Sequence, residues 1–265
     1  MYFRSSLMLF SLLLLLGCDK FNGNVTSKII GHAATGLKMP NAMYHDNSEA
    51  GIVYTQNLPF CDGVEVDVRM DKSGKLWLFH DETLHPETAE NGCVETHDSQ
   101  ALSQFRYRGI HQERLFLLTA ESANIFKGKF TFFDLKPLNA CENVLKDPEV
   151  LKNALIGLGL DTSTFALIVP DQTYFQALKN DFSVYLSIES LSQLTSSFLE
   201  NEPKLRGVVV RNKSIRLEEV NFLKSIHKKT VIFEVRSAKG IKEALKKNPD
   251  YVLTDDVKLT VGLIH

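Results

Sequence analysis

Residues 63–70 read GVEVDVRM, and this stretch decides the fold class. Successive residues of a β-strand point to opposite faces, so Glu65 and Asp67 share one face and three valines share the other. The apolar face is typical of a barrel strand covered by helices. Both carboxylates then point into the barrel, with Cα atoms about 6–7 Å apart. Because buried neighbouring acids need a positive partner, usually a hard divalent cation with oxygen ligands, the stretch predicts a metal or substrate site.

Seven further apolar runs rich in Val, Ile and Phe follow the same logic. Segments with helical spacing separate them, a pattern that indicates repeated βα units and a parallel sheet. With residues 63–70 they make eight expected strands, the number that a closed (β/α)8 TIM barrel needs. The other seven cover residues 28–33, 130–136, 165–170, 184–188, 207–211, 230–235 and 251–254. We expect helices over residues 149–158, 217–227 and 238–247, and one barrel domain over residues 28–265.

Residues 76–129 are too long for a simple βα connection. A short strand over residues 76–79 is expected within them, after the turn formed by Lys72, Ser73 and Gly74. We interpret the interval as an excursion over the top of the barrel.

The amino terminus has the layout of a bacterial export signal. Arg4 precedes an apolar run over residues 7–16, which ends in Gly17 and Cys18. The run of about ten residues is shorter than the roughly 20 that a helix needs to cross a bilayer. Its Leu-Leu-Gly-Cys ending resembles the lipobox of bacterial lipoproteins, in which the cysteine accepts lipid. We expect residues 1–17 to be a signal peptide and residues 18–27 a lipidated tether to the cell envelope. An ordinary cleaved signal is the alternative.

Charge and cysteine content narrow the function classes. Lys and Arg number 30 against 32 Asp and Glu, without a basic run interleaved with aromatics, so we expect a small-molecule ligand and no nucleic acid. Export would place the remaining cysteines in an oxidising compartment. Cys61 precedes an apolar strand and is expected to pack as a free thiol. Cys93 and Cys141 lie in polar stretches and are the disulfide candidates, although sequence does not establish connectivity.

Two histidines stand where a barrel enzyme places its chemistry. His32 ends the first expected strand, and His80 follows the short run at residues 76–79. A single histidine after an apolar strand is more often structural. Two at the carboxyl ends of strands, flanking the acidic strand, point to the active-site face. Histidine also titrates near neutral pH, as a proton-transfer residue should.

These motifs, taken in order, resemble the glycerophosphodiester phosphodiesterase family. Its members carry His-Arg-Gly after strand one, Glu-x-Asp on strand two, a later His-Asp, and Glu-x-Lys on strand three. This chain has HAA at residues 32–34, EVD at 65–67, HD at 80–81 and DLK at 134–136. Residues 231–236 and 251–255 look like the family's Trp-Thr-Val-Asn and closing Thr-Asp strands. The resemblance extends over roughly residues 28–257.

The resemblance implies roles for the matching residues. In the family, three acids hold Ca²⁺ or Mg²⁺, two histidines act as acid and base, and a lysine neutralises phosphoryl charge. The matching positions are, in the same order, Glu65, Asp67 and Asp134, His32 and His80, and Lys136. Phe233 would form an apolar wall for the glycerol moiety, or would be ordinary core. The implied reaction is metal-dependent hydrolysis of a phosphodiester, with a glycerophosphodiester as the leading substrate.

The chain departs from the family pattern at three places. Ala33 replaces the arginine that contacts the phosphate, residues 40–42 read PNA in place of Pro-Glu-Asn, and Asp134 is one methylene shorter than glutamate. Two alternatives therefore stay open. One is a phospholipase-type enzyme that acts by intramolecular cyclisation, and the other is a non-catalytic lipoprotein that uses the barrel as a binding module. Both histidines and all three acids are present, which favours catalysis.

Cys18→Ser should leave an unprocessed precursor without lipid, because only the thiol can accept the lipid group. Detergent-phase partition and the mass of the mature amino terminus would test this. Unchanged membrane attachment and mass in the variant would contradict the lipidation site.

Overall fold

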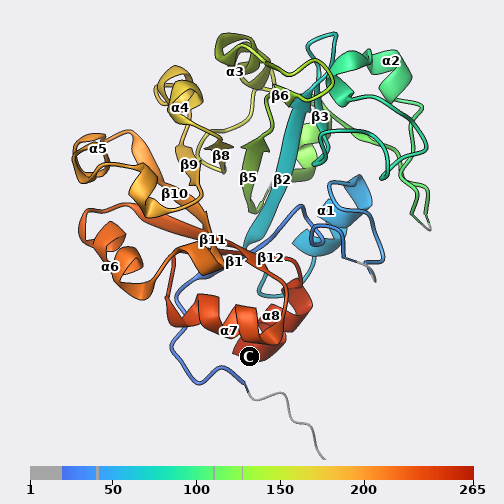
Figure 1. Ribbon diagram of the computed structural model, residues 1–265. Coiled ribbons are helices and arrows are strands. Elements are labelled where there is room, and N and C mark those ends of the chain that lie inside the picture. The colour runs from blue at the N-terminus through green and yellow to red at the C-terminus, as the bar shows by residue number, and fades with distance from the viewer. Residues whose placement is uncertain (1–19, 40–41, 110, 127) are drawn as a thin grey trace, which may run out of the picture.

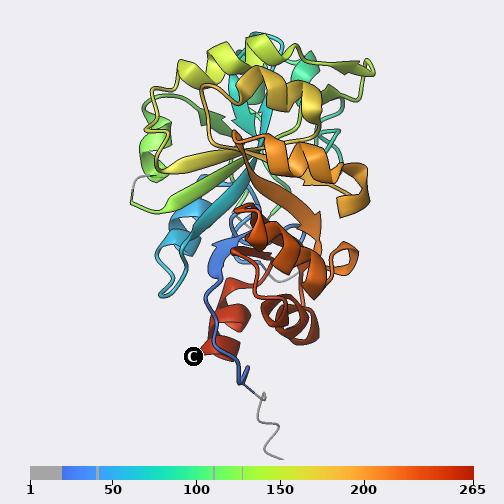
Figure 2. The ribbon, with the colours of Figure 1, turned by 90° about the vertical axis from the view of Figure 1, so that its left-hand side faces the viewer.

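Eight parallel strands close into a barrel surrounded by helices (Figures 1 and 2). The computed structural model describes residues 20–39, 42–109, 111–126 and 128–265. The expected signal peptide and Cys18 lie outside these residues. The order around the barrel is β1-β12-β11-β10-β9-β8-β5-β2, and pairing of β1 with β2 closes the ring. The predicted (β/α)8 TIM barrel is confirmed.

All eight expected strands are present. They are β1 (Lys28–Gly31), β2 (Gly63–Met70), β5 (Phe130–Leu135), β8 (Phe165–Val169), β9 (Val184–Ile188), β10 (Leu205–Arg211), β11 (Lys229–Val235) and β12 (Tyr251–Thr254). Two strand bounds differ from the expectation by two residues: β10 begins at Leu205 instead of residue 207, and β1 was expected to reach residue 33. It ends at Gly31 because Ala33 and Ala34 adopt left-handed φ values of 43° and 67°, which a strand cannot include.

Helices follow most of the strands, and the three helices expected from the sequence are found within two residues of their bounds. The helices are α1 (Glu49–Gln56), α2 (Ser99–Leu102), α3 (Pro148–Ile156), α4 (Gln172–Leu178), α5 (Ser196–Asn201), α6 (Leu217–Ser225), α7 (Ala238–Lys246) and α8 (Val257–Ile264). Short 3₁₀ helices are η1 (Val94–Thr96), η2 (Ser122–Phe126), η3 (Leu191–Gln193) and η4 (Asn212–Ser214). Within the described ranges, none of the helices has the length and apolar character that a membrane crossing requires.

The alternation of β2 divides the core into two layers. Val64, Val66 and Val68 pack outward in the large cluster between strands and helices. A separate inner cluster fills the barrel, with Phe132, Tyr185, Tyr251 and residues of other strands. The two acids of β2 therefore point inward above this inner cluster, as predicted.

The excursion after β2 adds two short strands to the barrel sheet at the end of β2 (Figure 1). Strand β3 (Leu76–Leu78) pairs antiparallel with the end of β2, and β4 (Phe116–Leu118) pairs with β3. Strands β6 (Leu138–Asn139) and β7 (Val144–Leu145) form a hairpin after β5. A disulfide joins Cys93 of the excursion to Cys141 of this hairpin, with Cα atoms 6.0 Å apart, and Cys61 is a buried free thiol.

Removing the disulfide with Cys93→Ala and Cys141→Ala should lower the free energy of unfolding. The bridge closes a span of 48 residues, and the chain-entropy model gives a loss of about 4 kcal/mol. Denaturant unfolding with and without reductant measures it. Cys61→Ala is the matched control and should keep the sensitivity to reductant. Peptide mapping that finds both Cys93 and Cys141 free to alkylate would refute the bridge.

Candidate active site

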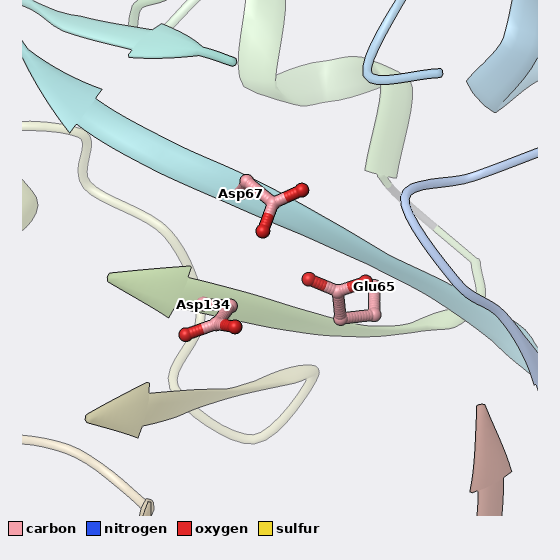
Figure 3. A group of neighbouring side chains, drawn as sticks. All are labelled: Glu65, Asp67 and Asp134. Carbon is pink, nitrogen blue, oxygen red and sulfur yellow. The ribbon is translucent and has the colours of Figure 1, made fainter. Parts of the chain in front are cut away.

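Three carboxylates meet inside the carboxyl end of the barrel. The register of β2 with β5 pairs Asp67 with Asp134, and Glu65 lies two residues before Asp67 on the same face. Figure 3 shows the three side chains turned toward one another from these two strands. One carboxylate oxygen from each lies within 4.8 Å of the others. Asp134, although shorter than glutamate, therefore reaches the same cluster.

Local hydrogen bonds set the orientation of the two β2 acids. Glu65 Oε2 accepts a hydrogen bond from Ala33 N at 2.7 Å. The side-chain amide of Asn47 donates to Asp67 Oδ2, and its carbonyl accepts from Asp67 N, both at 2.8 Å. Asn47 was not singled out in the sequence, because only the tertiary fold brings the residue before Ser48, the N-cap of α1, against β2.

Two oxygens of this cluster lack hydrogen bonds. Within the described residues, buried Glu65 Oε1 and Asp67 Oδ1 have no hydrogen-bond partner. Lys136 Nζ lies 3.1 Å from Asp67 Oδ1 without satisfying hydrogen-bond angles, and 2.6 Å from Asp134 Oδ2. Buried carboxylate oxygens are rarely left unpaired. One ammonium facing three carboxylates, with two open oxygens, fits the all-oxygen donor set of Ca²⁺ or Mg²⁺.

The pKa values of the acids reflect their confinement. Burial, followed by the charge of Asp67, raises the pKa of Glu65 to about 8. Burial also raises the pKa of Asp134. Burial opposes ionisation of Asp67 as well, but the nearby positive charge of Lys136 and the hydrogen bond from Asn47 outweigh it and lower its pKa to about 2. Without a cation, ionisation is therefore favoured at Asp67 and disfavoured at Glu65.

His32 lies next to this cluster. Its Nδ1 lies 2.8 Å from Asp255 Oδ1 and its Nε2 lies 3.8 Å from Glu65 Oε2. Burial disfavours the charged ring, but the hydrogen bond to Asp255 and the charges of Glu65 and Asp255 outweigh it and raise the pKa of His32 to about 9. Asp255 directly follows β12, in the predicted Thr-Asp strand end.

His80 is held in a similar way. Its Nδ1 lies 2.8 Å from Asp81 Oδ1, and Asp81 pairs with Lys38 at 2.9 Å. The buried Arg69 donates to the backbone carbonyl of His80 at 3.0 Å and to Glu95 at 2.8 Å. Because a carboxylate occupies Nδ1 of each histidine, Nε2 is the nitrogen left for proton transfer in both.

A cavity of about 280 Å³ brings the expected site residues together. His32, His80, Glu65, Asp134 and Lys136 line it, with Asp67 buried behind Lys136. Phe233 forms part of its wall, and its ring centroid lies 6.1 Å from that of His32. A larger hollow of about 820 Å³ between α1 and β4 contains none of these residues. We assign the chemistry to the smaller cavity, because it alone of the two holds acids and histidines together.

The remaining expectations fall outside this cavity. Cys93 and Cys141 form the bridge beside the barrel, and Pro40 and Asn41 lie outside the described residues. Ala33 carries only a methyl group, so its position offers no cationic side chain to the cavity. Four residues that support the site were not predicted as site residues from the sequence: Asn47, Arg69, Arg236 and Asp255. Arg69 could have been found, because it continues the inward face of Glu65 and Asp67.

Comparisons with known proteins agree with this geometry. The profile of the glycerophosphoryl diester phosphodiesterase family matches residues 61–259. A comparison with curated proteins finds no match.

Solved structures share the fold at low sequence identity. A provisional glycerophosphoryl diester phosphodiesterase from Agrobacterium tumefaciens has a TM-score of 0.75 at 14% identity, covering 90% of this chain and 97% of its own. An Oleispira antarctica phosphodiesterase in complex with the product sn-glycerol-3-phosphate has 0.72 at 18%, covering 90% and 96%. A glycerophosphodiester phosphodiesterase from Parabacteroides distasonis has 0.70 at 17%, covering 91% and 98%.

The family match spans most of the barrel and includes the two acids of β2, the third acid on β5 and Asp255. The chain belongs to the glycerophosphoryl diester phosphodiesterase family and is a phosphoric diester hydrolase.

Proposed function

We propose that this protein hydrolyses glycerophosphodiesters with a divalent cation held by Glu65, Asp67 and Asp134. The observation that carries the metal site is a pair of buried carboxylate oxygens inside a cluster of three acids that, within the described residues, accept no hydrogen bond. The substrate class is supported by the family match and by the relative from Oleispira antarctica, whose structure holds sn-glycerol-3-phosphate.

Bound at the three carboxylates, Ca²⁺ or Mg²⁺ would supply electrostatic stabilisation to the non-bridging phosphoryl oxygens. The ammonium of Lys136 lies next to two of these carboxylates, those of Asp67 and Asp134. A cation bound to these carboxylates would leave the ammonium free to face the phosphoryl group. Phe233, in the cavity wall, offers an apolar surface to the carbon skeleton of glycerol.

His32 and His80 perform the proton transfers in this proposal. One takes the proton from the attacking water or substrate hydroxyl, a new bond to phosphorus forms, and the other donates a proton to the departing alkoxide oxygen. Asp255 and Asp81 hold the Nδ1 atoms, so each ring keeps a defined orientation during the exchange. Each carboxylate also stabilises the imidazolium form of its ring, which is the form that the base acquires and the form from which the acid donates.

The same residues could act on a phospholipid by intramolecular cyclisation. A cyclic phosphate would then accumulate in place of a phosphomonoester.

For localisation, we propose an exported protein attached to the envelope through Cys18, and the Leu-Leu-Gly-Cys ending supports this.

The purified chain should release alcohol from glycerophosphodiesters when Ca²⁺ or Mg²⁺ is present, and not with chelator. A panel of glycerophosphodiesters and lysophospholipids, with products identified by mass, distinguishes hydrolysis from cyclisation. His80→Ala should reduce turnover by at least about a hundredfold, because it removes a proton-transfer group. The exposed His265 gives a matched control in His265→Ala. No product from any diester with either cation would refute the proposal.

Adding Ca²⁺ or Mg²⁺ to chelated protein should raise its melting temperature. A ligand of the folded state adds about 2.7 kcal/mol at a hundredfold excess over Kd. Glu65→Gln should abolish the rise without unfolding the barrel, whereas Glu200→Gln on the surface should keep it. Because the pKa of Glu65 is raised to about 8, protons compete with the cation below that pH, and the rise should grow with pH up to about 8. A melting temperature that does not change with either cation at millimolar concentration would refute the metal site.

A further inference from the structure

A bulge near the end of β11 turns one arginine toward the active-site cavity. On this strand Val231 and Phe233 point into the barrel, and Ile232 and Val235 pack outward. The pairing with β12 shifts by one residue between Ile232 and Val235, and Glu234 has a left-handed φ of 63°. Without this extra residue, alternation would turn Val235 inward and Arg236 outward. The bulge reverses the order, and Arg236 lines the cavity.

Strand register then places Arg236 in one row with the catalytic groups. Val235 pairs with Thr254 and Thr254 pairs with Gly31, so the next residues on three adjacent strands lie side by side. These residues are, in order, Arg236, Asp255 and His32. Arg236 Nε donates to Asp255 Oδ2 at 3.0 Å, while Asp255 Oδ1 lies 2.8 Å from His32 Nδ1.

The contact through Nε leaves the far end of the guanidinium open. Within the described residues, the two terminal nitrogens of Arg236 make no hydrogen bond, and the side chain is 52% exposed. Asp255 is fully buried and anchors the group in place. Two parallel N–H groups on a fixed plane match the geometry of two phosphoryl oxygens.

We propose that Arg236 binds the phosphodiester anion and is a substrate-binding residue of this enzyme. The inference rests on the proposed function and adds a cationic contact on the side of the cavity away from Lys136. The position after His32 offers no such contact, because Ala33 has no charged side chain. Asp255 thereby connects two tasks, since one of its oxygens orients His32 and the other orients Arg236.

Arg211 is the matched comparison within the same cavity. It has similar exposure, 43%, but two carboxylates already engage it, Glu189 at 3.4 Å and Glu234 at 3.3 Å. Its guanidinium also covers the ring of Phe233, 5.2 Å from the centroid. Its charge is therefore largely balanced by its neighbours, whereas Arg236 has a single carboxylate partner that it shares with His32.

The test measures binding of inorganic phosphate by calorimetry to the full chain with Mg²⁺, alongside steady-state kinetics on a glycerophosphodiester. Arg236→Gln should weaken phosphate binding and raise KM by roughly ten- to hundredfold, the range of a charge-assisted hydrogen bond. Arg236→Lys should lie between, because it keeps the charge and loses the paired N–H groups. Arg211→Gln should change either quantity by a clearly smaller factor. Circular dichroism verifies that each variant is folded.

Equal phosphate affinity in wild type and Arg236→Gln would overturn the inference, as would equal losses in the Arg236 and Arg211 variants. A fall in kcat with unchanged KM and phosphate affinity would also overturn it, since Arg236 would then act only by positioning His32. If the wild-type protein hydrolyses the diester in these cases, the proposed function still holds and only the role of Arg236 is refuted. Conversely, phosphate binding that depends on Arg236 in a protein that hydrolyses no diester would refute the proposed function alone.

Discussion

The confinement of three carboxylates in one buried space is the constraint on which the site depends. Glu65 and Asp67 are almost fully buried, and Asp134 faces them from the adjacent strand β5. Such charges would repel one another and lose hydration, so the surrounding groups must compensate. Lys136 balances part of the charge, and Asn47 and the backbone amide of Ala33 supply hydrogen bonds. Within the described residues, two of the carboxylate oxygens still accept no hydrogen bond, and the proposed function offers these atoms to a cation.

Three residues around the cavity have unusual backbone conformations. Ala33, Asn47 and Glu234 all adopt left-handed φ values, which are uncommon for residues other than glycine. Each of the three contributes to the site. The N–H of Ala33 donates to Glu65, and the side-chain amide of Asn47 hydrogen-bonds both the carboxylate and the backbone N–H of Asp67. Glu234 lies in the bulge that precedes Arg236. Strained backbone of this kind persists where surrounding packing determines it, and here it surrounds the proposed chemistry.

The position of His80 depends on contacts between the barrel and the excursion after β2. Arg69 reaches from β2 to the carbonyls of His80 and Leu138 and to the carboxylate of Glu95. Glu95 lies two residues after Cys93, whose disulfide ties the excursion to the hairpin of β6 and β7. The excursion and the barrel thus share one buried ion pair, and breaking it would leave an uncompensated charge beside the site. Stability of the excursion and placement of His80 are therefore linked.

Sequence by itself determined the strands and the acidic face of β2, because alternation and apolar runs are local properties of the chain. It also pointed to His32 and His80, because barrel topology places every strand end at one face, whereas Asp134 and Lys136 were implied by the resemblance to the family. Tertiary structure decided what these patterns leave open. Asn47 belongs to no motif in the sequence, and Asp255 stands in the closing Thr-Asp strand end without an assigned role there. Only strand register and the pairing of β1 with β12 bring Asp255 to His32. Arg236 depends on a single extra residue in β11, and a bulge has no signature in alternation until the pairing of β11 with β12 reveals it.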